Sequence, residues 1–160
     1  LENSVDKFMI LLDLSRYTTT LSLYHKGSLA GVDSIGMGYE DWANALRRRF
    51  HLSMKECHEI ILDNCFVNNG QYDDNVSYIW LDHDENRQIT KKQIYETAFD
   101  EVKNWLTTVN GACESIAENG STKLILTGQG ADIVGISSIT KMILPNFLHS
   151  SIIPFILASN

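Results

Sequence analysis

The sequence predicts a mixed α/β fold, and the order of its segments carries this prediction. Three short runs near the N-terminus are rich in apolar and β-branched side chains, which is typical of strands. Later segments repeat apolar residues every three or four positions, as amphipathic helices do. A strand, a helix and a further strand are expected towards the C-terminus. Elements in this order are expected to form one sheet with helices packed against it.

The expected strands are bounded by turn signals and polar loops. Lys26 and Gly27 are expected to form the hairpin turn between the second and third strands. The polar segment 82–88 is expected to be a turn after the fourth strand. The expected strands span residues 7–14, 18–24, 28–35, 76–81, 123–127 and 152–156.

Two of the expected helices begin with the spacing of a capping box, in which two side chains each satisfy a free backbone N–H. Ser53 precedes Glu56 by three residues, and Thr90 precedes Gln93 by three. The long helix after Thr90 carries its apolar residues on one stripe, which continues to Ile116. The expected helices begin at Tyr39, at Ser53, after Thr90 and at Ile136.

Composition limits the classes of protein to which the chain can belong. Its 160 residues, 44% of them hydrophobic, suffice for one compact domain with a core. A net charge of −7 argues against nucleic acid as a partner, because phosphate binding needs a basic surface. Three cysteines without CxxC spacing are expected to be buried, reduced thiols. Without a secretory signal or a long apolar run, the chain is expected to be cytoplasmic.

A calcium loop is the one metal pattern that the sequence suggests, and it is incomplete. Asp82, Asp84 and Asn86 occupy the first, third and fifth places of such a loop. Calcium also needs a glycine at the sixth place and a glutamate at the twelfth, where this chain has Arg87 and Gln93. A solvated turn is the better interpretation, and no metal site is expected.

Two charged or glycine-containing segments have both a structural and a functional interpretation. Arg47, Arg48 and Arg49 span nearly a full helical turn, so they are expected to be solvated, with an acidic peptide as the alternative partner. The segment 124–136, LILTGQGADIVGI, places a glycine pair directly after a buried strand. Glycines let the backbone approach a ligand closely. Alone, however, this segment is only a strand-to-helix turn.

Considered with the opening segment LLDLSRYTTT (11–20), the segment 124–136 resembles part of the second half of FtsA, a bacterial actin-like ATPase of cell division. In that family a strand leads into the phosphate loop Asp-x-Gly-Gly-Gly-Thr-Thr-Asp, and an adenosine loop reads Leu-Thr-Gly-Gly-Gly-Ala. The segment 87–106 is similar to the family's Arg-x-Ile-Ser-Arg helix. The resemblance covers nearly the whole chain in the right order. The related pilus-assembly protein PilM fits the middle segment less well.

The resemblance implies an actin-like, ribonuclease H-like mixed sheet with flanking helices and a small inserted α/β subdomain. Residues 1–38 and 120–160 would form the core subdomain, and residues 39–119 the outer one. It further implies a first actin-like domain in the parent protein, which this sequence does not contain.

By the same resemblance, the nucleotide pocket is expected to be degenerate. The three loop glycines are replaced by Ser15, Arg16 and Tyr17, and the residues expected to hold ribose and base fall on His58 and Ile61. A turn without glycine does not easily present successive N–H groups to a phosphate. The chain is therefore expected to have no catalytic residues and to hold no cofactor by itself. The positions that correspond to the family's pocket are Asp13, Ser15, Arg16, Thr18, Thr19, His58, Gly128, Gln129 and Gly130.

Two functions follow from the resemblance. The first is a non-enzymatic scaffold of the division septum that binds the tail of the tubulin homologue FtsZ on its outer subdomain, where Lys91 and Lys92 are the candidate contacts. Self-association and docking to the parent's first domain are further expected contacts, and any membrane attachment would lie in segments outside this sequence. The alternative is half of an FtsA- or PilM-type ATPase, in which Asp13 would orient a magnesium-bound water.

Overall fold

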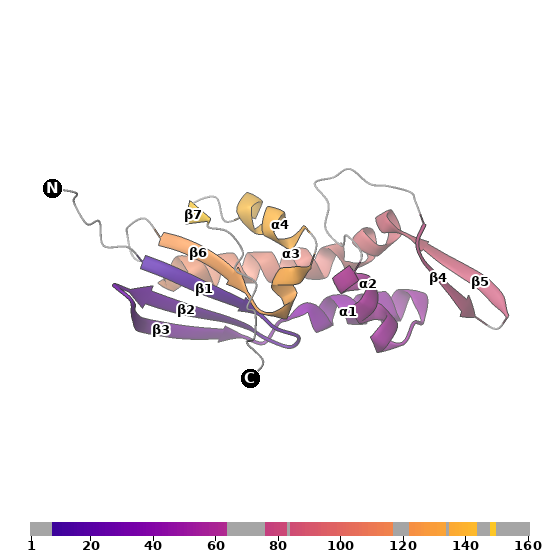
Figure 1. The fold of residues 1–160 in the computed structure, drawn as a ribbon, viewed down its shortest axis with the longest axis horizontal. Coiled ribbons are helices and arrows are strands. Elements are labelled where there is room, and N and C mark those ends of the chain that lie inside the picture. Colours follow the sequence, from indigo (N-terminus) through magenta and orange to yellow (C-terminus); the bar gives the residue numbers. More distant parts are fainter. Residues whose placement is uncertain are drawn as a thin grey trace, which may run out of the picture.

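The structure, a computed structural model, describes residues 8–63, 76–82, 84–116, 122–133, 135–143 and 148–149. Within these ranges the chain forms a five-stranded mixed sheet, a separate two-stranded sheet and four α-helices (Figure 1). The elements in chain order are β1 Phe8–Leu14, β2 Thr19–His25, β3 Ser28–Ile35, α1 Tyr39–Phe50, α2 Met54–Asp63, β4 Val76–Asp82, β5 Glu85–Thr90, α3 Lys91–Ile116, β6 Thr122–Thr127, the short 3₁₀ helix η1 Gln129–Asp132, α4 Ile136–Ile143 and β7 Leu148–His149.

The large sheet has the strand order β3-β2-β1-β6-β7. β1, β2 and β3 form an antiparallel meander, as the sequence predicts, and β6 pairs with β1 in parallel. The hairpin turn at Lys26 and Gly27 is also confirmed, and both residues have positive φ. In the parallel pair Asp13 lies opposite Thr127, so the carboxyl ends of β1 and β6 meet at the same edge of the sheet. Ligands of open α/β sheets bind outside such strand ends.

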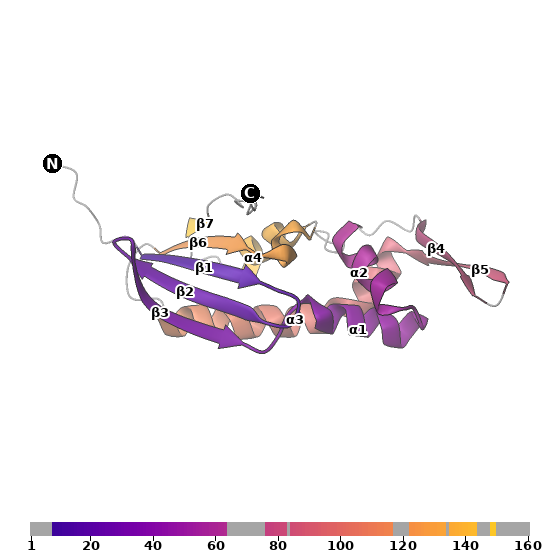
Figure 2. The ribbon, with the colours of Figure 1, turned by 60° about the horizontal axis from the view of Figure 1, so that its bottom comes forward.

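One face of the sheet is buried and carries the core. β1 alternates buried and half-buried residues, and Ile10, Leu12 and Leu14 are fully covered. α3 runs beneath this face (Figure 2). Trp105 of α3 donates its indole N–H to Thr19 Oγ1 on β2 at 2.8 Å, and Thr19 Oγ1 donates to the carbonyl of Met37 at 2.7 Å. This buried chain of hydrogen bonds attaches the helix to the sheet.

α3 also packs against α1, away from the sheet. Trp42 of α1 and Trp105 meet edge to face, with their ring centroids 5.5 Å apart. The 26-residue helix therefore contacts both the meander and α1, and Trp105 takes part in both contacts. The division of the chain at residues 39 and 119 remains a prediction. α3, which that division assigns to the outer part, also packs against the large sheet.

Both predicted capping boxes are confirmed. The Glu56 carboxylate accepts from the Ser53 N–H at 2.8 Å, and the Ser53 hydroxyl accepts from the Glu56 N–H at 3.3 Å. At the start of α3, Thr90 and Gln93 exchange the same two bonds at 3.0 and 3.2 Å.

The expected turn over residues 82–88 is wrong. Residues from Glu85 onward form strand β5, which pairs with β4 in a hairpin whose turn contains Asp84 at φ 66°. Four of the six β5 residues are polar and exposed, so the strand lacks the apolar alternation that predicts strands. The expected last strand, 152–156, lies outside the described residues. The strand that follows α4 among the described residues is β7, which pairs with β6 in parallel.

The structure bears on the cysteines, on possible metal ligands and on possible membrane-spanning helices. Cys57 and Cys113 are buried and free, and burial raises the pKa of their thiols to about 11 and about 12. The described residues contain no group of three or more His, Cys, Asp or Glu side chains placed to hold a metal ion. No helix among the described residues is long and apolar enough to cross a bilayer.

Thr19→Val should destabilise the fold, because it leaves the buried Trp105 N–H without an acceptor and the Met37 carbonyl without a donor. We expect the free energy of unfolding to fall by about 1–3 kcal/mol, the usual cost of an unsatisfied buried polar group. Urea denaturation followed by tryptophan fluorescence measures this. Thr20→Val, on the half-buried opposite face of the same strand, is the matched control and should change stability by less than half as much.

Candidate functional site

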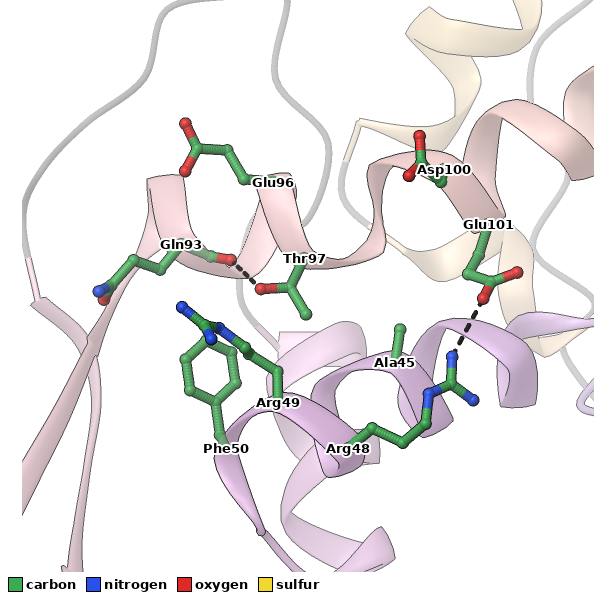
Figure 3. Close-up of a pocket in the computed structure, with 9 residues that line it drawn as sticks. All are labelled: Ala45, Arg48, Arg49, Phe50, Gln93, Glu96, Thr97, Asp100 and Glu101. Atoms are coloured by element: carbon green, nitrogen blue, oxygen red, sulfur yellow. Dashed lines mark hydrogen bonds and ion pairs between the residues drawn. The ribbon is translucent and has the colours of Figure 1, made fainter.

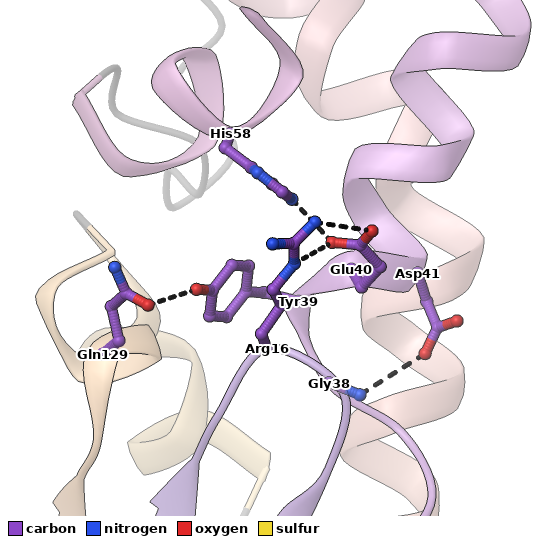
Figure 4. Close-up of polar contacts among 7 residues, drawn as sticks. All are labelled: Arg16, Gly38, Tyr39, Glu40, Asp41, His58 and Gln129. Atoms are coloured by element: carbon purple, nitrogen blue, oxygen red, sulfur yellow. Dashed lines mark hydrogen bonds and ion pairs between the residues drawn. The ribbon is translucent and has the colours of Figure 1, made fainter. Parts of the chain in front are cut away.

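Side chains from four elements converge beyond the carboxyl ends of β1 and β6. We call this group the strand-end cluster, and Figure 4 shows most of it. It lies where the β1–β2 turn, the N-terminus of α1, one side of α2 and the start of η1 meet. Its members are Asp13, Ser15, Arg16, Tyr39, Glu40, His58 and Gln129.

The β1–β2 turn closes on itself through local hydrogen bonds. The Ser15 N–H donates to the Thr18 carbonyl at 2.9 Å, and the Ser15 hydroxyl donates to Asp13 Oδ1 at 2.7 Å. The amide group of Ser15 is therefore used inside the turn, and one oxygen of the Asp13 carboxylate already has a donor. The Arg16 guanidinium lies over the Tyr17 ring, 4.9 Å from its centroid.

The N-terminus of α1 is pressed against this turn. The Glu40 N–H donates to the Arg16 carbonyl at 2.8 Å, and the Tyr39 N–H donates to the Ser15 carbonyl at 3.4 Å. Gly38, the N-cap residue, makes the approach possible, since a Cβ there would lie 2.4 Å from the Arg16 carbonyl oxygen. The first amide groups of a helix often bind anions. In this protein two of these amide groups, those of Tyr39 and Glu40, already donate to carbonyls of the β1–β2 turn.

The Glu40 carboxylate is the centre of the polar contacts. Arg16 Nε donates to its Oε2 at 2.7 Å and Arg16 Nη2 to its Oε1 at 3.1 Å, a two-bond arrangement that suits guanidinium and carboxylate geometry. His58 Nε2 lies 2.6 Å from the same Oε2. The hydrogen bonds from Arg16 are the main cause of a lowered pKa for the Glu40 carboxyl, so Glu40 is an anion at neutral pH.

Tyr39 and the glycine pair close the other side of the cluster. The Tyr39 hydroxyl donates to Gln129 Oε1, and burial raises the pKa of this phenol. Gly128 has φ +84°, and a Cβ on it would lie 2.6 Å from Asp13 Oδ1. A Cβ on Gly130 would lie 2.3 Å from the Leu14 side chain. Both glycines therefore allow the loop after β6 to pack directly on the end of β1.

The structure brings together most of the residues predicted from the sequence. Asp13, Ser15, Arg16, His58 and Gln129 belong to the strand-end cluster, and Gly128 and Gly130 lie against it. Two predicted residues lie elsewhere: the Thr18 side chain is exposed, and Thr19 faces α3 on the buried side of the sheet.

The sequence-based reasoning missed Tyr39 and Glu40, although these residues make the cluster's long-range contacts. The one local signal was an acidic residue in the first turn of a helix that begins after a glycine. Such a residue is ordinarily explained by the helix dipole alone.

A second feature is a groove of about 540 Å³ between α1 and α3 (Figure 3). Its α1 wall contains two arginines and its α3 wall three acidic residues. Arg48 Nη2 bonds Glu101 Oε1 across it at 3.1 Å, and both side chains remain partly exposed. The lining residues are Ala45, Arg48, Arg49, Phe50, Gln93, Glu96, Thr97, Asp100 and Glu101.

The predicted partner contacts lie next to this groove. Lys91 and Lys92 are the first two residues of α3 and directly precede Gln93, and both are half-buried. The dipole of α3 disfavours positive charge at this end.

Gly38→Ala should be strongly destabilising, because the added Cβ would overlap the carbonyl oxygens of Ser15 and Arg16. We expect a loss of at least about 2 kcal/mol in the free energy of unfolding, as for other overpacked sites. Gly111→Ala in α3, where nothing lies within 4 Å of the new Cβ, should instead stabilise by about 0.5–1 kcal/mol. Parallel urea denaturation compares the two, and equal effects would contradict the close approach at Gly38.

Comparison with known proteins identifies the fold. No family model and no curated protein matches the sequence. Among solved structures, MreB5 of Spiroplasma citri bound to AMPPNP superposes with a TM-score of 0.69 at 14% identity, over 94% of this chain and 49% of that one. An archaeal actin homologue, Ta0583, in complex with ADP gives 0.64 at 14% identity, over 96% and 46%.

The PilM–PilN type IV pilus biogenesis complex gives a TM-score of 0.66 at 15% identity, over 93% of this chain and 38% of that one. The chain therefore spans about half, or less, of the length of these structures. FtsA as the particular relative stays a prediction. What the strand order, the flanking helices and these superpositions establish together is that the chain has the actin-like fold.

Proposed function

We propose that this chain is the second actin-like domain of a scaffold protein, and that it does not bind nucleotide by itself. Its parent would act on the cytoplasmic side of the division septum, where a domain of the FtsA type binds the tail of FtsZ. One observation supports the proposal: Arg16, Glu40 and His58 bond one another at the strand end where the resemblance leads us to expect the nucleotide phosphates.

The chemistry of the strand-end cluster supports the nucleotide part of this proposal. A phosphate loop offers free N–H groups and open space to an anion. In this chain the Ser15 N–H bonds Thr18, and the first N–H groups of α1 bond the turn carbonyls. The Glu40 carboxylate adds a negative charge that would repel a phosphate. The solved structures of MreB5 and Ta0583 are complexes with AMPPNP and ADP, but each of those chains is about twice as long as the part that matches this chain.

The groove between α1 and α3 supports the partner part. It has one basic wall and one acidic wall, so it suits a short peptide that carries both charges around an apolar residue. Phe50 and Ala45 provide apolar surface in its lining, and Lys91 and Lys92 directly precede the lining residue Gln93. A flexible tail would lose conformational entropy on binding, so its affinity is expected to be modest.

Titration with magnesium-ATP tests the first part. We expect no binding heat at micromolar concentration, because the contacts that are lost at the phosphate loop and the adenosine site are each worth about 1–3 kcal/mol. Together they correspond to several decades in the dissociation constant, since about 1.4 kcal/mol is tenfold. A micromolar dissociation constant that disappears in Asp13→Ala would overturn the scaffold proposal in favour of the ATPase.

Titration with a labelled FtsZ tail peptide tests the second part. Lys91→Glu/Lys92→Glu should weaken binding by roughly tenfold or more at low salt, because two attractive charges become repulsive. Lys55→Glu/Lys123→Glu makes the same charge change on α2 and β6, away from the groove, and is the matched control. If the two double variants bind alike, the lysines are not part of the site. If the wild type does not bind the tail, FtsZ is not the partner.

A further inference from the structure

We propose that Glu40 is a built-in plug for a small oxyanion site, and that Arg16 and His58 would bind inorganic phosphate once this carboxylate is removed. The inference rests on the proposed function, since it explains why the strand-end cluster does not accept an outside phosphate. Glu40 is the group that occupies the site, and inorganic phosphate is the ligand that the site would bind without it.

The geometry around Glu40 is that of a bound anion. Three donor contacts converge on its two carboxylate oxygens: two from the Arg16 guanidinium at 2.7 and 3.1 Å, and His58 Nε2 at 2.6 Å. Arginine binds phosphate oxygens through the same pair of parallel N–H bonds that it uses for a carboxylate. A phosphate that replaced the carboxylate would therefore keep both partners without a change in their positions.

The backbone holds the plug in place. The Glu40 N–H donates to the carbonyl of Arg16, the residue whose guanidinium its side chain binds. Gly38 allows this approach, so the carboxylate is presented to Arg16 from a rigid helix start. A tethered group competes at a high effective concentration, which an external ligand must exceed. Free phosphate at millimolar concentration is therefore excluded from the wild-type site.

The Arg16 end of the contact is accessible to solvent, whereas the Glu40 and His58 side chains are mostly buried. Side-chain exposure is 42% for Arg16, against 15% for Glu40 and 18% for His58, so solvent reaches the guanidinium while the bonded oxygens are sheltered. On the adjoining side, the buried Tyr39 donates its hydroxyl to Gln129, so this phenol already has a partner. With Arg16 and His58 as its two partners, the site suits a small oxyanion such as inorganic phosphate.

The test is titration of Glu40→Ala with inorganic phosphate at neutral pH, followed by calorimetry and by the ³¹P chemical shift. We expect phosphate to bind Glu40→Ala at least about tenfold more tightly than wild type, the factor that corresponds to one charge-assisted hydrogen bond. Adding Arg16→Met should abolish the gain. Magnesium-ATP should bind Glu40→Ala no more tightly than phosphate does, and a much tighter ATP complex would overturn the small-oxyanion assignment.

Glu101→Ala is the matched control, because it also removes the carboxylate partner of an arginine, Arg48, but leaves no histidine beside it. It should gain no phosphate affinity. Equal gains in both variants, or no gain in Glu40→Ala, would overturn the inference. If Glu40→Ala is unfolded without ligand, phosphate should restore its circular dichroism spectrum, since a ligand of the folded state stabilises that state. Lack of restoration counts equally against the plug.

The outcomes separate this inference from the proposed function. Micromolar magnesium-ATP binding by the wild type would overturn the scaffold proposal, whatever Glu40→Ala does. A wild type that ignores magnesium-ATP, together with a Glu40→Ala variant that ignores phosphate, would leave the scaffold proposal standing and remove only the plug.

Discussion

The contact of the α1 N-terminus with the β1–β2 turn determines the arrangement of everything around it. Two backbone hydrogen bonds, from Tyr39 and Glu40 to the carbonyls of Ser15 and Arg16, hold the helix against the end of the sheet. The absence of a side chain at Gly38 is the condition for both bonds. From this contact Glu40 reaches Arg16, Tyr39 reaches Gln129, and the far end of α1 is positioned beside α3.

The same contact changes how glycines near a strand end should be interpreted. Glycines after a strand are commonly explained by the close approach of a ligand. Here Gly38, Gly128 and Gly130 all lie where another part of the chain approaches, at distances that a Cβ would not permit. The neighbours of these glycines are protein backbone and side chains. At these three positions the protein's own atoms occupy the space next to the glycine.

The sequence predicted elements whose signals are local, and it failed where contacts connect distant parts of the chain. The apolar runs of β1 and β6 and the capping pair of Ser53 and Glu56 were readable because propensity and spacing determine them. β5 was missed because its exposed, polar residues carry no periodic signal. Glu40 lies 24 positions from Arg16, and Tyr39 lies 90 positions from Gln129, so no pattern in the sequence reveals either pair.

The length of α3 has a mechanical consequence. At about 1.5 Å per residue, its 26 residues extend about 39 Å, from the groove beside α1 to the face of the sheet. The same helix thus contacts both regions. The hydrogen bond from Trp105, a residue in the interior of α3, to Thr19 attaches the helix to the sheet. The groove and the sheet cannot rotate independently, because any relative movement must tilt or bend this helix. A force applied to α3 near Lys91 would therefore be transmitted to β2 through the contact between Trp105 and Thr19.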